Sequence, residues 1–194
     1  MSYAGLLHDR MPPLGPEQMT EAQRAAATAL ASGPRGGVRG PFIPLLRSPE
    51  LMDRLQKVGE YLRYQSALER RLCEFVILIT SRQWTQQFEW SVHVPLARAA
   101  GLEAGIAEAL ADGRRPSGMA ADEEIAYDFC DELFRTHGVS ETTYQRAIAQ
   151  FSEQGVIDLL GIVGYFTTVS MVMNVAHTPA PEDGTVAPLA AFPF

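Results

Sequence analysis

Residues 85–93 read TQQFEWSVH and contain the first candidates for chemistry. Glu89 and His93 are four positions apart, about one helical turn, so their side chains should lie on one face of a helix. A carboxylate beside an imidazole raises the imidazole pKa, and such a pair can transfer protons near neutral pH. The alternative is an exposed pair that contributes only about 0.3–0.5 kcal/mol. The flanking aromatic residues, Phe88 and Trp90, argue against full exposure.

A second carboxylate candidate lies upstream, where the segment LCEFVILI at 72–79 surrounds Glu74 with apolar residues. The apolar neighbours at Leu72, Phe75 and Val76 define a buried helix face. Glu74 either joins that interior or points to solvent between two arginines, and helical periodicity leaves both open. If it points inward, it becomes a third member of the Glu89–His93 pair.

A metal site is the other chemistry that this spacing allows. Glu89 and His93 would supply two ligands from one helix face, and Glu74 or His177 could supply a third. The segment lacks the second histidine of an HExxH zinc helix. We therefore predict no metal and no cofactor.

Secondary candidates surround the same segment. Arg82 and Trp84 lie at the turn before it, where a cation could meet an anionic substrate, although Arg82 could instead satisfy helix carbonyls. His177 follows an apolar helix and could close a pocket. Gln86 and Trp90 are further candidates for contact with the substrate.

The two cysteines, Cys73 and Cys130, form no CxxC, which excludes a redox dithiol and a cysteine zinc site. Both fall among apolar residues, so buried inert thiols are expected.

Composition sets the broad class of protein. The chain has 194 residues, of which 46% are hydrophobic and 20% charged, as expected for one soluble globular domain. A net charge of -7 argues against nucleic acid as a partner. The first sixteen residues lack a signal-peptide pattern, and no run of 18 uncharged apolar residues occurs. We expect a cytoplasmic protein that binds no membrane.

Helix signals are dense and strand signals are scarce, so an all-α fold is predicted. Residues 1–178 should form a single domain, with a core motif at 66–102, an N-terminal helix and apolar loop at 17–47, and an extended tail at 179–194 that a partner would order. The loop must dock on its own domain or on a neighbouring subunit. The last helix is apolar almost all round, which favours an oligomer. About eight helices are expected, at 17–31, 48–64, 67–82 (capped by Ser66), 85–101 (capped by Thr85), 103–111, 120–136, 140–153 and 155–174.

The segment RRLCEFVILITSRQWTQQFEWSVHVPLARAAGL resembles the core motif of the carboxymuconolactone decarboxylase family, which includes the alkylhydroperoxidase-D (AhpD)-like proteins. That motif has a glutamate on one helix, a turn, and a second helix with a histidine, and Glu74 and His93 fit these positions. The segments LLRSPEL, GEYLRY and GVIDLLGIVGYFTTVSMVMNV also look like this family. The resemblance covers about residues 40–178. It implies a compact all-α bundle that assembles into trimers or hexamers, with a site near Glu74, Glu89 and His93.

One departure from the family bears on function. The peroxidase branch has a CxxC whose second cysteine lies four residues before the histidine, and here Gln86 and Glu89 occupy these positions. Thiol-dependent peroxide reduction cannot run without the peroxidatic thiolate. The resemblance thus implies the decarboxylase-type branch: a cofactor-free lyase acting on a small anionic lactone or carbonyl compound, as in aromatic compound degradation. His93, held by Glu89, would stabilise or reprotonate a dienolate-like anion, and Glu74 would orient it.

Two other functions remain open. The chain could be a non-catalytic ligand-binding or structural oligomer that retains the fold. It could also be a thiol-dependent alkyl hydroperoxidase that uses Cys73, which would require an exposed thiol of low pKa. The surroundings of Glu89, His93 and Cys73 distinguish these alternatives.

Overall fold

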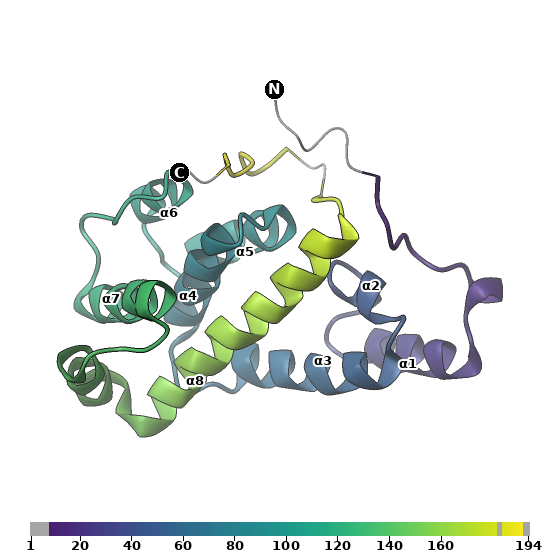
Figure 1. Ribbon diagram of the computed structural model, residues 1–194, viewed down its shortest axis with the longest axis horizontal. Helices are drawn as coiled ribbons and strands as arrows, with labels where there is room; N and C mark the ends of the chain where they lie inside the picture. The colour runs from purple at the N-terminus through teal and green to yellow at the C-terminus, as the bar shows by residue number, and fades with distance from the viewer. Residues whose placement is uncertain (1–7, 182–183, 192–194) are drawn as a thin grey trace.

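The computed structural model describes residues 8–181 and 184–191, and within them it contains eight α-helices and no strand (Figure 1). This confirms the all-α class predicted from the sequence. A short 3₁₀ helix at Pro16–Gln18 precedes the first α-helix. The helices are α1 (Glu21–Ser32), α2 (Phe42–Leu45), α3 (Pro49–Tyr64), α4 (Arg70–Gln83), α5 (Gln87–Ala99), α6 (Ala104–Ala111), α7 (Ala121–Thr136) and α8 (Glu141–Ala176).

Helix α4 lies at the centre of the bundle and packs against α3, α5, α6, α7 and α8. Its residues from 72 to 82 are all buried, because the apolar run covers every side of this helix. Such burial on all sides fits a helix enclosed by others. Glu74 therefore lies in the interior and is only 3% exposed, which settles the alternative that the periodicity left open.

Helix α8 runs obliquely across the molecule, with α7 packed near its start and α2 and α3 along its length (Figure 1). Its backbone is not helical at Ser152 (φ 63°), so it is two helices joined at a kink, close to the predicted boundary. Among the described residues, α8 is the one helix long and apolar enough to cross a membrane. However, 56% of its most apolar window is buried inside this fold, as in the core helix of a soluble protein.

Two predicted helix caps are wrong. Ser66 does not cap α4, which begins four residues later, because Asp158 of α8 accepts hydrogen bonds from the Ser66 hydroxyl (3.2 Å) and the Ala67 N–H (2.7 Å). Thr85 does not cap α5 either. It has a positive φ of 46°, and the next residue, Gln86, is the N-cap.

The apolar N-terminal segment docks on its own chain. The predicted loop contains the four-residue helix α2, and α1 packs against α3. This confirms one of the two docking alternatives and places the segment beside α3 and α8 (Figure 1). The apolar cluster that holds it consists of Leu30, Phe42, Leu45, Leu46 and Met52.

The described parts of the C-terminal tail, residues 179–181 and 184–191, have no helix or strand, and the second part contacts its own chain. The Gln87 side chain forms two hydrogen bonds of 2.8 Å with the backbone of Leu189, which is 6% exposed. This stretch therefore contacts its own chain through Gln87, and its ordering by a partner stays a prediction. The expected features at 1–7, 182–183 and 192–194 lie outside the described residues.

Candidate active site

His93 lies between two carboxylates, one at each nitrogen of its ring. Its Nδ1 is 2.6 Å from Oε2 of Glu74, and its Nε2 is 3.2 Å from Oε2 of Glu89. Each of the three residues is only 3% exposed. The structure therefore brings Glu74, Glu89 and His93 into one buried cluster.

Two packed helices position this cluster. Glu74 projects from α4 toward α5, while Glu89 and His93 lie one turn apart on α5. The first turn of α5 is fixed by Gln86, whose side-chain oxygen accepts from the backbone N–H groups of Phe88 (2.6 Å) and Glu89 (3.4 Å). These bonds satisfy two of the free N–H groups of the helix start and fix the backbone beneath Glu89.

Contacts with α8 hold both the imidazole ring of His93 and the side chain of Gln86. The rings of His93 and Phe166 of α8 pack in a T-shaped arrangement, with 5.2 Å between their centroids and an interplanar angle of 86°. The Gln86 amide donates to Oδ1 of Asn174 at 2.9 Å, which ties the start of α5 to α8. These contacts fix the ring between its two carboxylates.

This geometry limits how protons can be distributed over His93 and its two carboxylate partners. Burial disfavours the imidazolium, but the hydrogen bonds and charges of Glu74 and Glu89 outweigh it and raise the pKa of His93 above its usual 6.5. A neutral imidazole has one N–H, so it cannot donate to both carboxylates. The cluster is satisfied when His93 is doubly protonated or when Glu89 carries the second proton.

A cavity of about 350 Å³ opens onto one side of the cluster. Glu89 and His93 line it, whereas Glu74 lies behind His93 and does not. Apolar walls come from Phe88 and Val92 of α5 and Phe166 of α8. His93 and Glu89 can therefore each exchange a proton with a ligand in the cavity, whereas Glu74 reaches the ligand only through His93.

The cavity also contains residues that the sequence analysis did not identify. Arg35 and Arg39 reach it from the glycine-rich stretch before α2, Arg63 from the end of α3, and Tyr165 from α8. The one sequence signal was two arginines in RGGVRG, inside an apolar loop whose docking could not be deduced.

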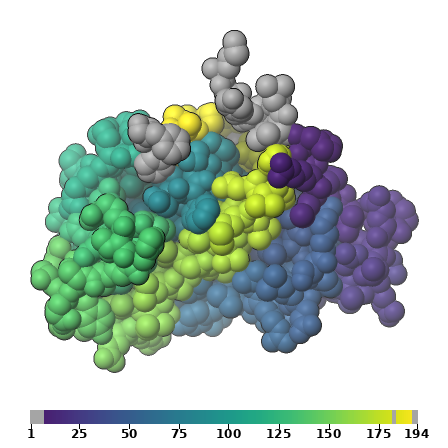
Figure 2. Space-filling model, viewed as in Figure 1, coloured from purple at the N-terminus to yellow at the C-terminus, as the bar shows by residue number. Residues whose placement is uncertain are grey.

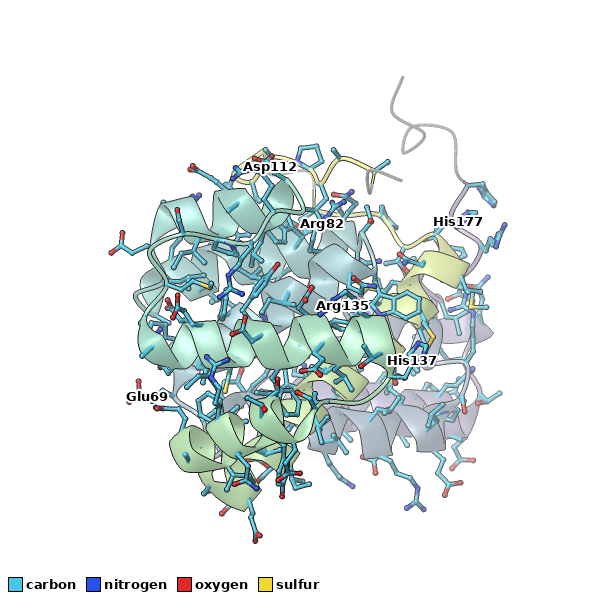
Figure 3. All side chains as sticks on the ribbon, turned by 60° about the vertical axis from the view of Figure 1, so that its left-hand side comes forward. Glu69, Arg82, Asp112, Arg135, His137 and His177 are labelled. Carbon is cyan, nitrogen blue, oxygen red and sulfur yellow. The ribbon has the colours of Figure 1, made fainter. Side chains whose placement is uncertain are left out.

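The secondary candidates do not line this cavity. Arg82 lies at the end of α4, where it donates to the Ala190 carbonyl at 2.7 Å and lines a different cavity of about 290 Å³ between α4, α6 and α7. The Trp84 indole donates to Thr167 at 3.1 Å, and Trp90 is a core residue. His177 caps the end of α8 (Figure 3) and is not among the residues that line the cavity.

Both cysteines are buried free thiols. Cys73 is 3% exposed and its Sγ lies 3.5 Å from the Leu68 carbonyl oxygen, while Cys130 is fully buried. Burial raises the pKa of the Cys73 thiol to about 11 and that of Cys130 to about 12. Neither thiol is therefore ionised near neutral pH, as a peroxidatic cysteine must be.

Over residues 8–181 and 184–191, no group of three or more His, Cys, Asp and Glu side chains is arranged to hold a metal ion. In the cluster, each carboxylate of Glu74 and Glu89 is directed at a ring nitrogen of His93. The donor atoms therefore face one another and do not converge on a common point.

Comparison with known proteins supports the fold. No family model matches the sequence, and no curated protein matches it. A solved structure from Ralstonia eutropha JMP134, an uncharacterized peroxidase-related protein with the alkylhydroperoxidase AhpD core, matches with a TM-score of 0.73 at 15% identity, covering 90% of this chain and 93% of that one. A protein of unknown function from Agrobacterium tumefaciens, linked by name to the antioxidant defence protein AhpD, matches with a TM-score of 0.64 at 18% identity, covering 72% and 96%.

These likenesses show that the chain has the AhpD-like fold. At such low sequence identity they are evidence for the fold alone. Within the cluster, Glu89 and His93 are the residues that face the cavity.

Proposed function

We propose that the protein is a cofactor-free lyase, of the carboxymuconolactone decarboxylase type, that acts on a small anionic lactone or carbonyl compound by acid/base chemistry. One observation carries the proposal: the buried Glu89–His93 pair lines a cavity of ligand size, with Glu74 fixed behind it. A buried, hydrogen-bonded acid/base pair at a cavity wall is the arrangement that proton transfer to a bound molecule needs.

The proposed reaction has two steps. The bond to the departing carboxylate breaks, and its electron pair moves into the adjacent carbonyl system, which gives CO2 and a dienolate-like anion. The imidazolium of His93 stabilises this anion, and a proton passes from His93 or Glu89 to the carbon. The product gains one proton, which the cluster recovers from solvent.

The roles of the three residues follow from their places. Glu89 and His93 are the groups in contact with the cavity, so they hold and deliver the proton. Glu74 does not reach the cavity and serves as a positioning residue that holds Nδ1 and stabilises the imidazolium. An oriented acid/base of this kind contributes roughly 10²–10⁴-fold to the rate.

The alternatives have weaker support. A non-catalytic ligand-binding oligomer has no use for an acid/base pair that turns toward the cavity, because burying three ionisable groups is costly. A thiol-dependent alkyl hydroperoxidase would need a reactive thiolate, and the burial and raised pKa of Cys73 remove the candidate.

We further propose that the protein works as a cytoplasmic homo-oligomer, a trimer or hexamer. The support is an exposed apolar stripe on one side of α8. Figure 2 shows that this helix reaches the surface of the molecule. A stripe of this kind is typical of a protein–protein contact. Its residues are Ile157, Leu160, Met171 and Val175.

A substrate screen tests the activity. Small lactones and β-keto acids would be incubated with the wild-type protein and with Glu89→Gln, and CO2 release would be measured. We expect release by the wild type and a loss of roughly 10²–10⁴-fold in the variant. Equal release by both proteins would overturn the proposal, and so would failure of the whole panel to react.

A further inference from the structure

Three arginine side chains gather around the cavity that Glu89 and His93 line. They are Arg35, Arg39 and Arg63, and within the described residues none of them has an ion pair. This is unusual in a chain with a net charge of -7, where carboxylates are abundant. Ion pairs with carboxylates hold six other arginines, namely Arg54, Arg71, Arg114, Arg115, Arg135 and Arg146.

Aromatic rings hold two of the three guanidinium groups. The Cζ atom of Arg35 lies 4.5 Å from the ring centroid of Phe42, and that of Arg63 lies 5.2 Å from the centroid of Tyr64. The Nε atom of each arginine is buried and has no hydrogen-bond partner in the part of the chain that is described. A stacked guanidinium keeps its planar fork fixed, and a buried N–H without an acceptor is costly. Both features favour an anionic ligand.

The residues next to Arg35 do not neutralise its charge. Its Nη2 donates to the Gln56 carbonyl at 3.3 Å and lies beside the Tyr165 hydroxyl. Both groups fit there because residue 59 is glycine: a Cβ on Gly59 would lie 2.4 Å from the Tyr165 oxygen and 2.8 Å from Nη2. Burial raises the pKa of Tyr165 to about 12, so its hydroxyl stays protonated and neutral.

We propose that Arg35 and Arg63, with Arg39 at the more exposed edge, form a carboxylate-binding wall that orients the ligand toward Glu89 and His93. The planar fork of arginine matches a carboxylate through two parallel hydrogen bonds. The body of the ligand then lies against the apolar walls of the cavity. The N-terminal segment at 33–47 thus supplies part of the substrate site and sets its specificity.

This inference rests on the proposed lyase activity for the position of the reacting centre, and it adds a constraint on the substrate. A carboxylate held by two guanidinium groups is stabilised in the ground state, and it loses that stabilisation when it leaves as neutral CO2. Such binding would raise the barrier to its loss. The carboxylate at the arginine wall is therefore a non-reacting one, and a substrate that is decarboxylated carries a second acidic group.

Calorimetric titration of the full-length protein with benzoate, its neutral analogue benzamide and inorganic phosphate tests the carboxylate wall. We expect benzoate to bind and benzamide to bind at least about tenfold more weakly. Arg35→Gln and Arg63→Gln should each weaken benzoate binding by a similar factor. Arg54→Gln is the matched control, because Arg54 lies on the same helix as Arg63 but is exposed and pairs with Glu50.

Equal binding of benzoate and benzamide by the wild type would overturn the inference. This comparison does not depend on whether any variant folds. Two further results would overturn it: absence of benzoate binding, and unchanged benzoate affinity in Arg35→Gln/Arg63→Gln. Phosphate binding as tight as benzoate binding would also overturn it, because it would indicate a phosphate site.

The same experiment separates this inference from the proposed activity. The Gln side chain of Glu89→Gln cannot carry a negative charge, so this variant should bind benzoate at least as tightly as the wild type. Arginine-dependent binding with no turnover of any substrate would support the carboxylate wall and contradict the lyase. Turnover that survives both arginine substitutions would support the lyase and overturn the wall.

Discussion

Glu74 contacts His93 across two helices, and the contact is the shorter of the two that the imidazole makes. Its 2.6 Å separation from Nδ1 compares with 3.2 Å between Nε2 and Glu89. The tighter partner is the one that does not reach the cavity. Glu74 is therefore the carboxylate that orients the ring, and Glu89 is the one that faces the cavity. The loss of each should have a different effect.

Glu74→Gln should keep the ring in place and remove the charge behind it, because an amide oxygen still accepts from the Nδ1–H. One cause of the raised pKa of His93 is then lost, so the high-pH limb of the rate profile should move to lower pH. We expect kcat to fall by roughly tenfold or more with little change in KM. The measurement is kcat and KM as a function of pH on a substrate found by the screen.

Glu50→Gln, an exposed change on α3, is the control and should match the wild type. An unshifted pH profile in Glu74→Gln would show that Glu74 has a merely structural role.

The stability of the protein should depend on the protonation of His93. Its pKa is raised in the folded state above the usual 6.5, so its stabilising contribution is fully present below pH 6.5 and is lost as pH rises through the folded pKa. Between these two values the free energy of unfolding should fall by up to about 1.4 kcal/mol per pH unit. Denaturant unfolding from pH 6 to 8, at fixed protein concentration, measures this slope.

The double variant Glu74→Gln/Glu89→Gln should lose most of the slope, because the imidazolium no longer has a carboxylate partner. A free energy of unfolding that stays flat or rises with pH in the wild type would contradict the charged cluster.

The two thiols should be inert in the native protein. Burial raises the pKa of Cys73 to about 11 and that of Cys130 to about 12, so a thiol-specific reagent at pH 8 should label neither until the chain unfolds. Alkyl hydroperoxide should not be consumed in the presence of a thiol reductant, and Cys73→Ala should behave identically. Rapid native labelling of Cys73 would restore the peroxidase alternative, as would robust consumption of peroxide.

Much of the helix pattern could be predicted because its signals are local. Ser48 and Pro49 correctly mark the start of α3, and the predicted break in the last helix falls beside Ser152. The start of α4 could not be predicted in this way. Ser66 has the residue type of a cap, but Asp158, about ninety positions away, binds both its hydroxyl and the next backbone N–H. Such a contact exists only once α8 has packed.

The same distinction between local and long-range signals applies to the residues of the candidate site. The Glu89–His93 pair follows from helical spacing, and Glu74 joins it because α4 packs against α5. The contribution of Arg35 and Arg39 to the arginine wall could not be foreseen, because the segment at 33–47 has no periodicity from which the direction of a side chain could be read. Its place is set by apolar docking against α3 and α8, and this docking carries Arg35 and Arg39 to the cavity.

Gly59→Ala should disturb the cavity through one added methyl group. The new Cβ would lie 2.4 Å from the Tyr165 hydroxyl, and the Tyr165 ring cannot retreat easily because it packs against Phe166 at 5.1 Å. We expect a loss of about 1–3 kcal/mol in stability and weaker binding of benzoate. Gly105→Ala is the matched control, since its added Cβ meets nothing within 4 Å and should be neutral or slightly stabilising. Equal stability of the two variants would contradict the close packing of Tyr165 beneath the arginine wall.

The apolar stripe on α8 should be an interface between copies of this chain. Ile157 is 65% exposed and Val175 is 60% exposed, which is costly for large aliphatic side chains that remain in water. Sedimentation should therefore give a species larger than the 21.3 kDa single chain. Ile157→Asp/Val175→Asp should shift it toward the monomer, because each charge would be buried at the contact without a partner. Arg54→Gln, an exposed change off the stripe, should leave the assembly unchanged, and a monomeric wild type would exclude this interface.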